Sequence, residues 1–191
     1  MSWQTELRSW MFPRAVVPAA PPDIGQPAPT SHVKTGDKPV VVAFLRHCGC
    51  PFAEKTFLDL RASAVAHPDI RHVAVSHSDQ PSTDRWLASL PDPSNNQKVE
   101  MIVDPEREVY AAWGLGLSSF WHFLSPSSLH SVYTLGKEEG IWNRPTESGS
   151  RWQSSGSFAV DADGLVNWGR PNESADEIPN FEEAVEALDK V

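Results

Sequence analysis

The chain has few cysteines, no long apolar run and no excess of basic residues. Its 191 residues include only two cysteines, Cys48 and Cys50, which are too few and too close together to form a stabilising disulfide framework. No apolar stretch approaches the roughly 20 residues that are needed to span a bilayer. The formal net charge is −9, and Lys and Arg form no run, which argues against nucleic acid or an anionic membrane as the main partner.

The N-terminal segment also lacks the marks of a secretory signal. Residues 1–13 mix charged residues with tryptophan and contain no continuous apolar segment. We therefore expect a cytoplasmic protein, in a compartment where thiols are mostly reduced. Proline recurs up to Pro39, which predicts an extended N-terminal arm over residues 1–38, lying on the surface of a single domain that spans residues 39–191.

Alternating apolar patterns predict an α/β fold. Strands are expected at residues 40–45, 70–77, 99–103, 158–160 and 165–168, and helices at 51–66, 82–90, 105–113, 126–135 and 179–190. The first strand is apolar throughout, as in a central strand that is buried on both faces. The element order predicts a mixed central sheet flanked by helices, with an irregular insertion before the C-terminal β-hairpin.

Three helix boundaries are suggested by single residues. Ser82 or Thr83 is a candidate N-cap for the second helix, and Asp104 before Pro105 is a candidate N-cap for the third. Gly114 is expected just beyond the C-terminus of that third helix.

Cys50 is the most informative residue, because it stands between the first strand and the helix that begins at Pro51. A cysteine at a helix N-terminus meets unpaired N–H groups and the positive end of the helix dipole, which favour the thiolate. The thiolate is the reactive form, so the position suggests redox or nucleophilic chemistry. The alternative is a small buried apolar side chain without reactivity.

This order, with a cysteine between the first strand and its helix, resembles the thioredoxin fold. Three stretches, Phe44–Phe52, Val103–Leu115 and Gly156–Gly164, look like segments of the peroxiredoxin-like AhpC/TSA family, and most like its fungal thioredoxin-like branch. The resemblance implies an antioxidant enzyme in which Cys50 reduces a peroxide. The sulfenic acid formed there is then reduced by a second thiol, such as glutathione or thioredoxin. It also implies a possible homodimer.

The chain departs from the family pattern at three positions. His47 stands where typical peroxiredoxins have Thr or Ser, Ala53 replaces the second cysteine of a Cys-x-x-Cys pair, and Ser155 precedes Gly156 where thioredoxins carry a cis-proline. Two alternatives therefore stay open. One is an enzyme of another reaction type that acts on a small organic substrate, and the other is a non-catalytic binding module.

Three more residues near the turn are candidates for chemistry. Cys48 is the only possible partner thiol within the chain; alternatively, it fills an apolar site and never pairs. Arg46 and His47 are candidates to stabilise the Cys50 thiolate, and His47 also to shuttle a proton. Because neighbouring residues of an extended strand face opposite sides, we expect only one of these two to face the site.

Further candidates lie in the insertion and at its end. Arg151 is a candidate to stabilise the thiolate or bind an anionic substrate group, and the alternative is an ordinary surface arginine. The candidate substrate-binding residues are Phe52, Trp121, Trp152, Gln153 and Ser155. For the aromatic ones, the alternative is that they pack the insertion against the core. We expect no metal and no cofactor, because His47 and the two cysteines lack a second, well-separated ligand pair.

Overall fold

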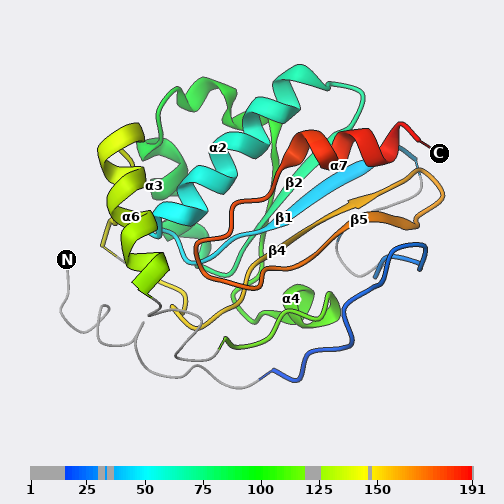
Figure 1. Cartoon of the computed structure of the whole chain (residues 1–191), viewed down its shortest axis with the longest axis horizontal. Coiled ribbons are helices and arrows are strands. Elements are labelled where there is room, and N and C mark those ends of the chain that lie inside the picture. The colour runs from blue at the N-terminus through cyan, green and yellow to red at the C-terminus, as the bar shows by residue number, and fades with distance from the viewer. Residues whose placement is uncertain (1–15, 30–32, 34–36, 119–125, 146–147, 191) are drawn as a thin grey trace.

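The computed structural model describes residues 16–29, 33, 37–118, 126–145 and 148–190. A five-stranded mixed sheet forms its centre (Figure 1). The strands are β1 (Val40–Phe44), β2 (Arg71–Ser76), β3 (Glu100–Val103), β4 (Gly156–Val160) and β5 (Val166–Pro171), in the spatial order β3-β2-β1-β4-β5. The first three are parallel, whereas β4 is antiparallel to both β1 and β5. The predicted mixed sheet with a closing hairpin is therefore confirmed.

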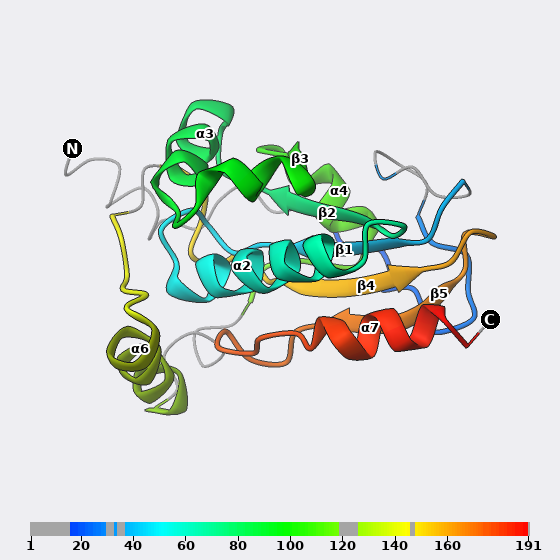
Figure 2. The same ribbon diagram turned by 90° about the horizontal axis from the view of Figure 1, so that it is seen from above.

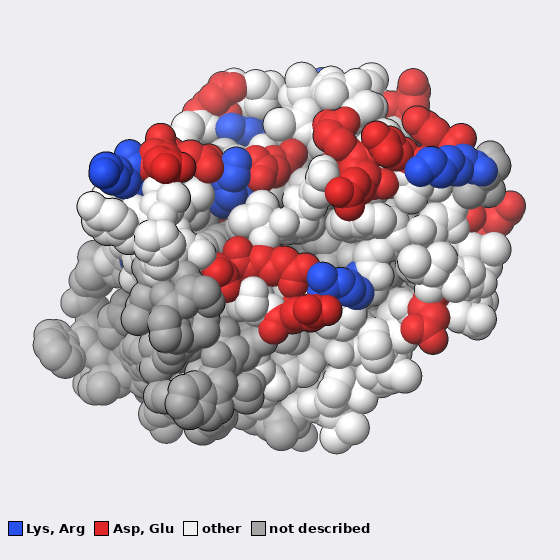
Figure 3. All heavy atoms as spheres, viewed as in Figure 1, with Lys and Arg blue, Asp and Glu red and all other residues white. Residues whose placement is uncertain are grey.

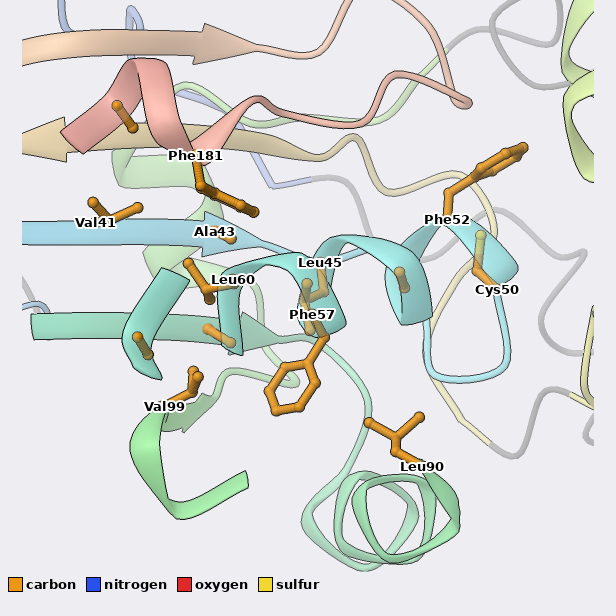
Figure 4. Close-up of a cluster of buried hydrophobic side chains, with 14 of the residues drawn as sticks. Val41, Ala43, Leu45, Cys50, Phe52, Phe57, Leu60, Leu90, Val99 and Phe181 are labelled. Atoms are coloured by element: carbon orange, nitrogen blue, oxygen red, sulfur yellow. The ribbon is translucent and has the colours of Figure 1, made fainter. Parts of the chain in front are cut away.

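The central strand β1 is buried along its whole length, as its apolar run predicts. Its side chains alternate between two apolar clusters, one on each face of the sheet. Val41 and Ala43 belong to the cluster drawn in Figure 4, which also holds Leu60 and Phe181. This two-sided burial fixes β1, and so fixes the position of the turn that follows it.

Helices cover both faces of the sheet (Figures 1 and 2). Helices α2 (Pro51–Ala66) and α7 (Phe181–Leu188) pack on one face, and α4 (Glu108–Ala112) packs on the other. The remaining helices are α3 (Gln80–Ser89), the 3₁₀-helix η1 (Pro93–Lys98) and α6 (Pro126–Glu139). Helix α6 lies beside α2, at the end where α2 begins.

Two predicted N-caps are wrong. Helix α3 is capped by Asp79, whose carboxylate accepts the N–H of Ser82, because Pro81 is tolerated within the first helical turn and lets the helix start earlier. Asp104 does not directly precede α4. A turn separates them, and Arg107 at the N-cap has a φ of 60°. The Asp104 carboxylate still accepts the N–H groups of residues 108–110.

The described part of the arm lies against the domain, as predicted. The N–H of Ala19 donates to the carbonyl of Ala111 in the last turn of α4, and Ala28 and Gln26 exchange backbone hydrogen bonds with the β4–β5 hairpin. Gly114, which follows α4 with a φ of +78° as its predicted C-terminal position requires, has no room for a Cβ beside Pro21. The division into an arm over residues 1–38 and a domain over 39–191 stays a prediction.

Acidic side chains predominate on the face shown in Figure 3, in keeping with the net charge of −9. Among the described helices, none has both the length and the apolar character of a membrane span.

Candidate functional site

Cys50 occupies the N-cap of α2, as predicted, and Pro51 is the first residue of the helix. Its backbone is extended (φ −74°, ψ 128°), and its N–H donates to the carbonyl of His47 at 3.1 Å. The first N–H groups of α2 and the helix dipole therefore converge at this residue. The residue is only 4% exposed, and Figure 4 shows it beside Phe52 at the start of the helix.

Cys48 is equally buried but lies in a different environment. Its Sγ is 3.6 Å from Ser76 Oγ and 3.8 Å from Thr83 Oγ1, and its N–H donates to Ser78 Oγ at 3.1 Å. Burial raises the pKa of the Cys48 thiol, although the neighbouring hydroxyls partly oppose this. Cys48 is therefore protonated at neutral pH. Both cysteines are free thiols in the structure.

Arg46 and His47 are both buried, at 2% and 1% exposed. The expectation that only one of them faces the site assumed an extended strand, but β1 ends at Phe44, so strand alternation does not apply. The Arg46 guanidinium donates to the carbonyl of Arg151 at 2.8 Å. This hydrogen bond brings Arg46 and Arg151 together, and both charges act on His47, so three sequence-predicted residues lie close together where the turn that holds the cysteines begins.

The charge state of His47 follows from this cluster. Burial lowers the pKa of His47 well below its usual value, and the positive charges of Arg151 and Arg46 lower it further. The imidazole is therefore neutral at pH 7. Its Nδ1 donates to the carbonyl of Cys48 at 3.2 Å, which leaves Nε2 as the unprotonated nitrogen. Arg151 is 7% exposed, so it is not an ordinary surface arginine.

The candidate substrate-binding residues that the structure describes are buried. The Gln153 amide nitrogen donates to the carbonyls of Leu115, Gly116 and Ser154, so this side chain bonds the loops together. Phe52 and Ser155 line a cavity of about 10 Å³, which has room for about one water molecule.

Trp152 is also buried, and its carbonyl accepts hydrogen bonds from the backbone and hydroxyl of Ser118. Trp121 lies outside the described residues. The substrate-binding roles of all five residues stay predictions.

A larger pocket, of about 170 Å³, opens beside Cys48. Arg85 and Trp86 of α3 line one part of it, and Arg144 and Pro145 line another. Sequence reasoning missed this pocket, because its walls come from segments far apart in the chain and Arg144 lies in an irregular stretch.

Arg144 belongs to a segment of residues 140–145 that covers the cysteine turn, and we call it the cover segment. The Arg144 N–H donates to the carbonyl of Gly49 at 2.9 Å. Its guanidinium lies 3.0 Å from a carboxylate oxygen of Glu54 on α2 and donates to Ser89 Oγ on α3 at 2.8 Å. One side chain thus ties the cover segment to both helices that flank the pocket.

The described residues contain no group of three or more His, Cys, Asp and Glu side chains that could hold a metal ion.

Solved structures of low sequence identity share this fold. A peroxiredoxin-like protein from Aquifex aeolicus has a TM-score of 0.58 at 14% identity, covering 93% of this chain and 97% of its own. A thiol peroxidase from Chromobacterium violaceum has a TM-score of 0.56 at 13% identity, covering 92% and 91%. AhpC from Enterococcus faecalis has a TM-score of 0.53 at 14% identity, covering 81% and 75%. The predicted thioredoxin-like fold is therefore confirmed.

At the level of sequence, no curated protein matches the chain. The family model described as AhpC/TSA antioxidant enzyme matches residues 58–174, a range that begins after the cysteine turn. Because this match covers more than half of the residues, the chain belongs to the AhpC/TSA antioxidant enzyme family.

Proposed function

We propose that the protein is a thiol oxidoreductase that reduces peroxides through the thiolate of Cys50. The observation that carries the proposal is the position of this cysteine at the N-cap of a 16-residue helix, directly before a proline. The converging N–H groups and the helix dipole stabilise a negative charge there, which lowers the free energy of the reactive form. Cys48 is as deeply buried but does not stand at the helix N-terminus, so in this proposal Cys50 is the nucleophile.

The groups at the base of the turn support this role. Arg46 and Arg151 place two positive charges next to the segment that holds Cys50, and a positive field favours a thiolate. His47 is neutral at pH 7, first because it is buried and then because of the same charges, so it adds no positive charge of its own to the turn.

The proposed reaction has two stages. The Cys50 thiolate attacks one peroxide oxygen; an S–O bond forms, the O–O bond breaks, and the leaving oxygen takes a proton to become water or an alcohol. A thiol reductant, such as glutathione or thioredoxin, then condenses with the sulfenic acid, releasing water and forming a mixed disulfide. A second reductant thiol breaks that disulfide, restoring Cys50 and leaving the oxidised reductant. We place this activity in the cytoplasm and infer a homodimer.

The test compares the purified protein with the Cys50→Ser and Cys48→Ser variants. Consumption of hydrogen peroxide and of tert-butyl hydroperoxide is measured with dithiothreitol as the reductant, and sulfenic acid is trapped with dimedone and located by mass spectrometry. We expect the wild-type protein to turn over and to be labelled at Cys50, and Cys50→Ser to fall to the rate without protein. Unchanged turnover in Cys50→Ser would refute the proposal.

A second candidate is an enzyme of another reaction type that acts on a small organic substrate. The pocket of about 170 Å³ beside Cys48 favours it, since hydrogen peroxide needs no such space. A protein that is inert to both peroxides, yet binds a small organic molecule in this pocket, would support this candidate over the first.

A further inference from the structure

The N-terminal arm runs past α4 (Figure 1), and two of its prolines pack against glycines that follow this helix. A Cβ added to Gly114 would lie 2.6 Å from the Cα of Pro21. A Cβ added to Gly116 would lie 3.1 Å from the Cγ of Pro18. The absence of a side chain at both glycines therefore lets the arm lie directly against the backbone there. Between the two prolines, the N–H of Ala19 donates to a carbonyl of α4 at 2.8 Å.

Gly116 also bonds to residues 150–155, the segment that precedes β4. The Gly116 carbonyl accepts hydrogen bonds from the amide of Gln153 at 3.0 Å and from the N–H and the hydroxyl of Ser154 at 3.0 and 2.8 Å. The same glycine therefore contacts both the arm and the segment that precedes β4.

Residues 115–118 and residues 150–155 lie outside the helices and the strands of the sheet. They are joined further by the N–H of Ser118, which donates to the carbonyl of Trp152 at 2.7 Å. Irregular segments of this kind have no ladder of regular hydrogen bonds, so their position depends on the contacts that neighbouring segments make. The packing of the arm against Gly116 is therefore expected to stabilise both segments.

The segment that precedes β4 carries Arg151, one of the two arginines whose charges support the proposed Cys50 thiolate. The Arg151 carbonyl accepts a hydrogen bond of 2.8 Å from the Arg46 guanidinium. Both arginines are buried, so close-packed neighbours surround their side chains. A shift of residues 150–155 would therefore change the position of both charges relative to the cysteine turn.

We propose that residues 18–21 act as a strap that holds the pair of Arg46 and Arg151 in the position that favours the reactive thiolate. The two prolines restrict the backbone of the strap, so it loses less conformational freedom when it docks. The strap positions the arginines and takes no part in the reaction itself. This role rests on the proposed function, whereas the docking of the strap can be measured without any activity.

The first test combines Pro18→Ser and Pro21→Ser in one variant. Amide hydrogen exchange, followed by NMR, reports on the N–H groups of Ser118 and Ser154, which join the two irregular segments. We expect both to exchange about tenfold faster in the double variant, because the segments open more often without the docked arm. The amides of β2 serve as the reference and should keep their rates.

Val17→Ser is the matched control. It removes an apolar side chain from the same arm at a position that is 88% exposed, so it should leave all of these rates unchanged. Unchanged exchange at Ser118 and Ser154 in the double variant would overturn the strap. Equal acceleration of the β2 amides would also do so, because it would mean that the whole fold is weakened.

The second measurement asks whether the strap acts on the thiolate. Mass spectrometry gives the rate at which iodoacetamide alkylates Cys50 at pH 7, relative to Cys48 in the same sample. We expect the double variant to slow Cys50 several-fold, because displaced positive charges favour the thiolate less. A fold that is merely loosened would speed the alkylation of both cysteines instead. In an Arg151→Gln background the two proline substitutions should have little further effect.

Two outcomes would overturn the positioning role. One is a Cys50 rate that the double variant leaves unchanged or raises, and the other is an equal loss in the Arg151→Gln background. These rates need neither peroxide nor reductant. Failure of the proposed function is seen separately, as the absence of peroxide turnover in the wild type or its persistence in Cys50→Ser, so the two failures are distinguishable.

Discussion

The backbone N–H of Arg144 donates to the carbonyl of Gly49 at 2.9 Å, and this bond fastens the cover segment onto the turn between the two cysteines. Gly49 has a φ of +102°, and a Cβ there would lie 2.9 Å from the carbonyl oxygens of both Arg144 and Pro145. Only glycine allows the turn and the cover segment to approach this closely.

We therefore predict that Gly49→Ala lowers the free energy of unfolding by about 2–3 kcal/mol, because the positive φ and the contact with two carbonyl oxygens both oppose a Cβ. Chemical denaturation gives the value. Gly140→Ala is the matched control, since Gly140 also has a positive φ, of +73°, but a Cβ at that position would meet no other atom within 4 Å. If Gly49→Ala lowers the free energy of unfolding no more than the control does, the cover segment can shift to make room for the Cβ without a cost in stability.

The ion pair between Arg144 and Glu54 leads to a second prediction, about access to the thiols. Glu54 is 4% exposed and Arg144 is 37% exposed, so the pair is stronger than a surface pair but partly screened by water. Arg144→Met and Glu54→Gln should each lower the free energy of unfolding by about 1–2 kcal/mol. Both should also speed the alkylation of Cys48 and Cys50 by iodoacetamide several-fold, because the cover segment opens more often.

Mass spectrometry of the alkylated peptides measures these rates. Arg71→Met, which breaks the ion pair with Glu100 between β2 and β3, is the control and should leave them unchanged. If the two cover-segment variants react no faster than the wild type, the ion pair does not control access.

Local sequence signals explain why Cys50 could be placed in advance. A continuous apolar run, a short turn and a proline are adjacent in the chain, so their meaning depends little on the rest of the fold. The partners of Arg144 could not be found in this way. Glu54 lies 90 residues away, and the segment that carries Arg144 has no period that would orient its side chain.

The contacts of Asp104 and Gln153 also could not be read fully from the sequence, because both involve irregular segments. The predicted N-cap at Asp104 is wrong, because a turn that the sequence pattern does not mark separates Asp104 from α4, and its carboxylate reaches the helix from across that turn. Contact of Gln153 with substrate stays a prediction, and nothing in the sequence indicates that its amide donates to three carbonyls of two irregular segments, at residues 115–116 and 154. Such segments lack regular hydrogen bonding, so side chains satisfy their backbone groups.

A third prediction concerns Tyr110 of α4, which is fully buried. Its hydroxyl lies 2.7 Å from the carbonyls of both Leu45 and Val75, so it joins the ends of β1 and β2 just before the cysteine turn. Tyr110→Phe should lower the free energy of unfolding by about 1–2 kcal/mol, because it removes a buried hydroxyl that donates to these carbonyls. Tyr133→Phe removes an exposed hydroxyl from α6 and should change stability little. Equal effects in the two variants, measured by denaturation, would argue against this link.

The last prediction concerns stability and pH at His77. This side chain is buried, and its Nε2 lies 3.0 Å from the carbonyl oxygen and 3.1 Å from the nitrogen of Ser150. Burial lowers the pKa of His77 to about 4, and the charges of Arg107 and Arg46 act in the same direction.

Between pH 6.5 and 4 the unfolded chain therefore binds a proton at His77 that the folded chain does not, so stability falls as the pH falls. One such histidine contributes a slope of at most about 1.4 kcal/mol per pH unit, and His72, whose pKa burial also lowers to about 4, contributes in the same window. His77→Gln should reduce the slope of the free energy of unfolding against pH by the contribution of one histidine, whatever the effect of the variant on stability at pH 7. Denaturant unfolding at pH 7, 6 and 5 measures this slope, with His130→Gln as the control for losing an exposed histidine. An unchanged slope in His77→Gln would mean that His77 takes up its proton in the folded protein as readily as in the unfolded chain.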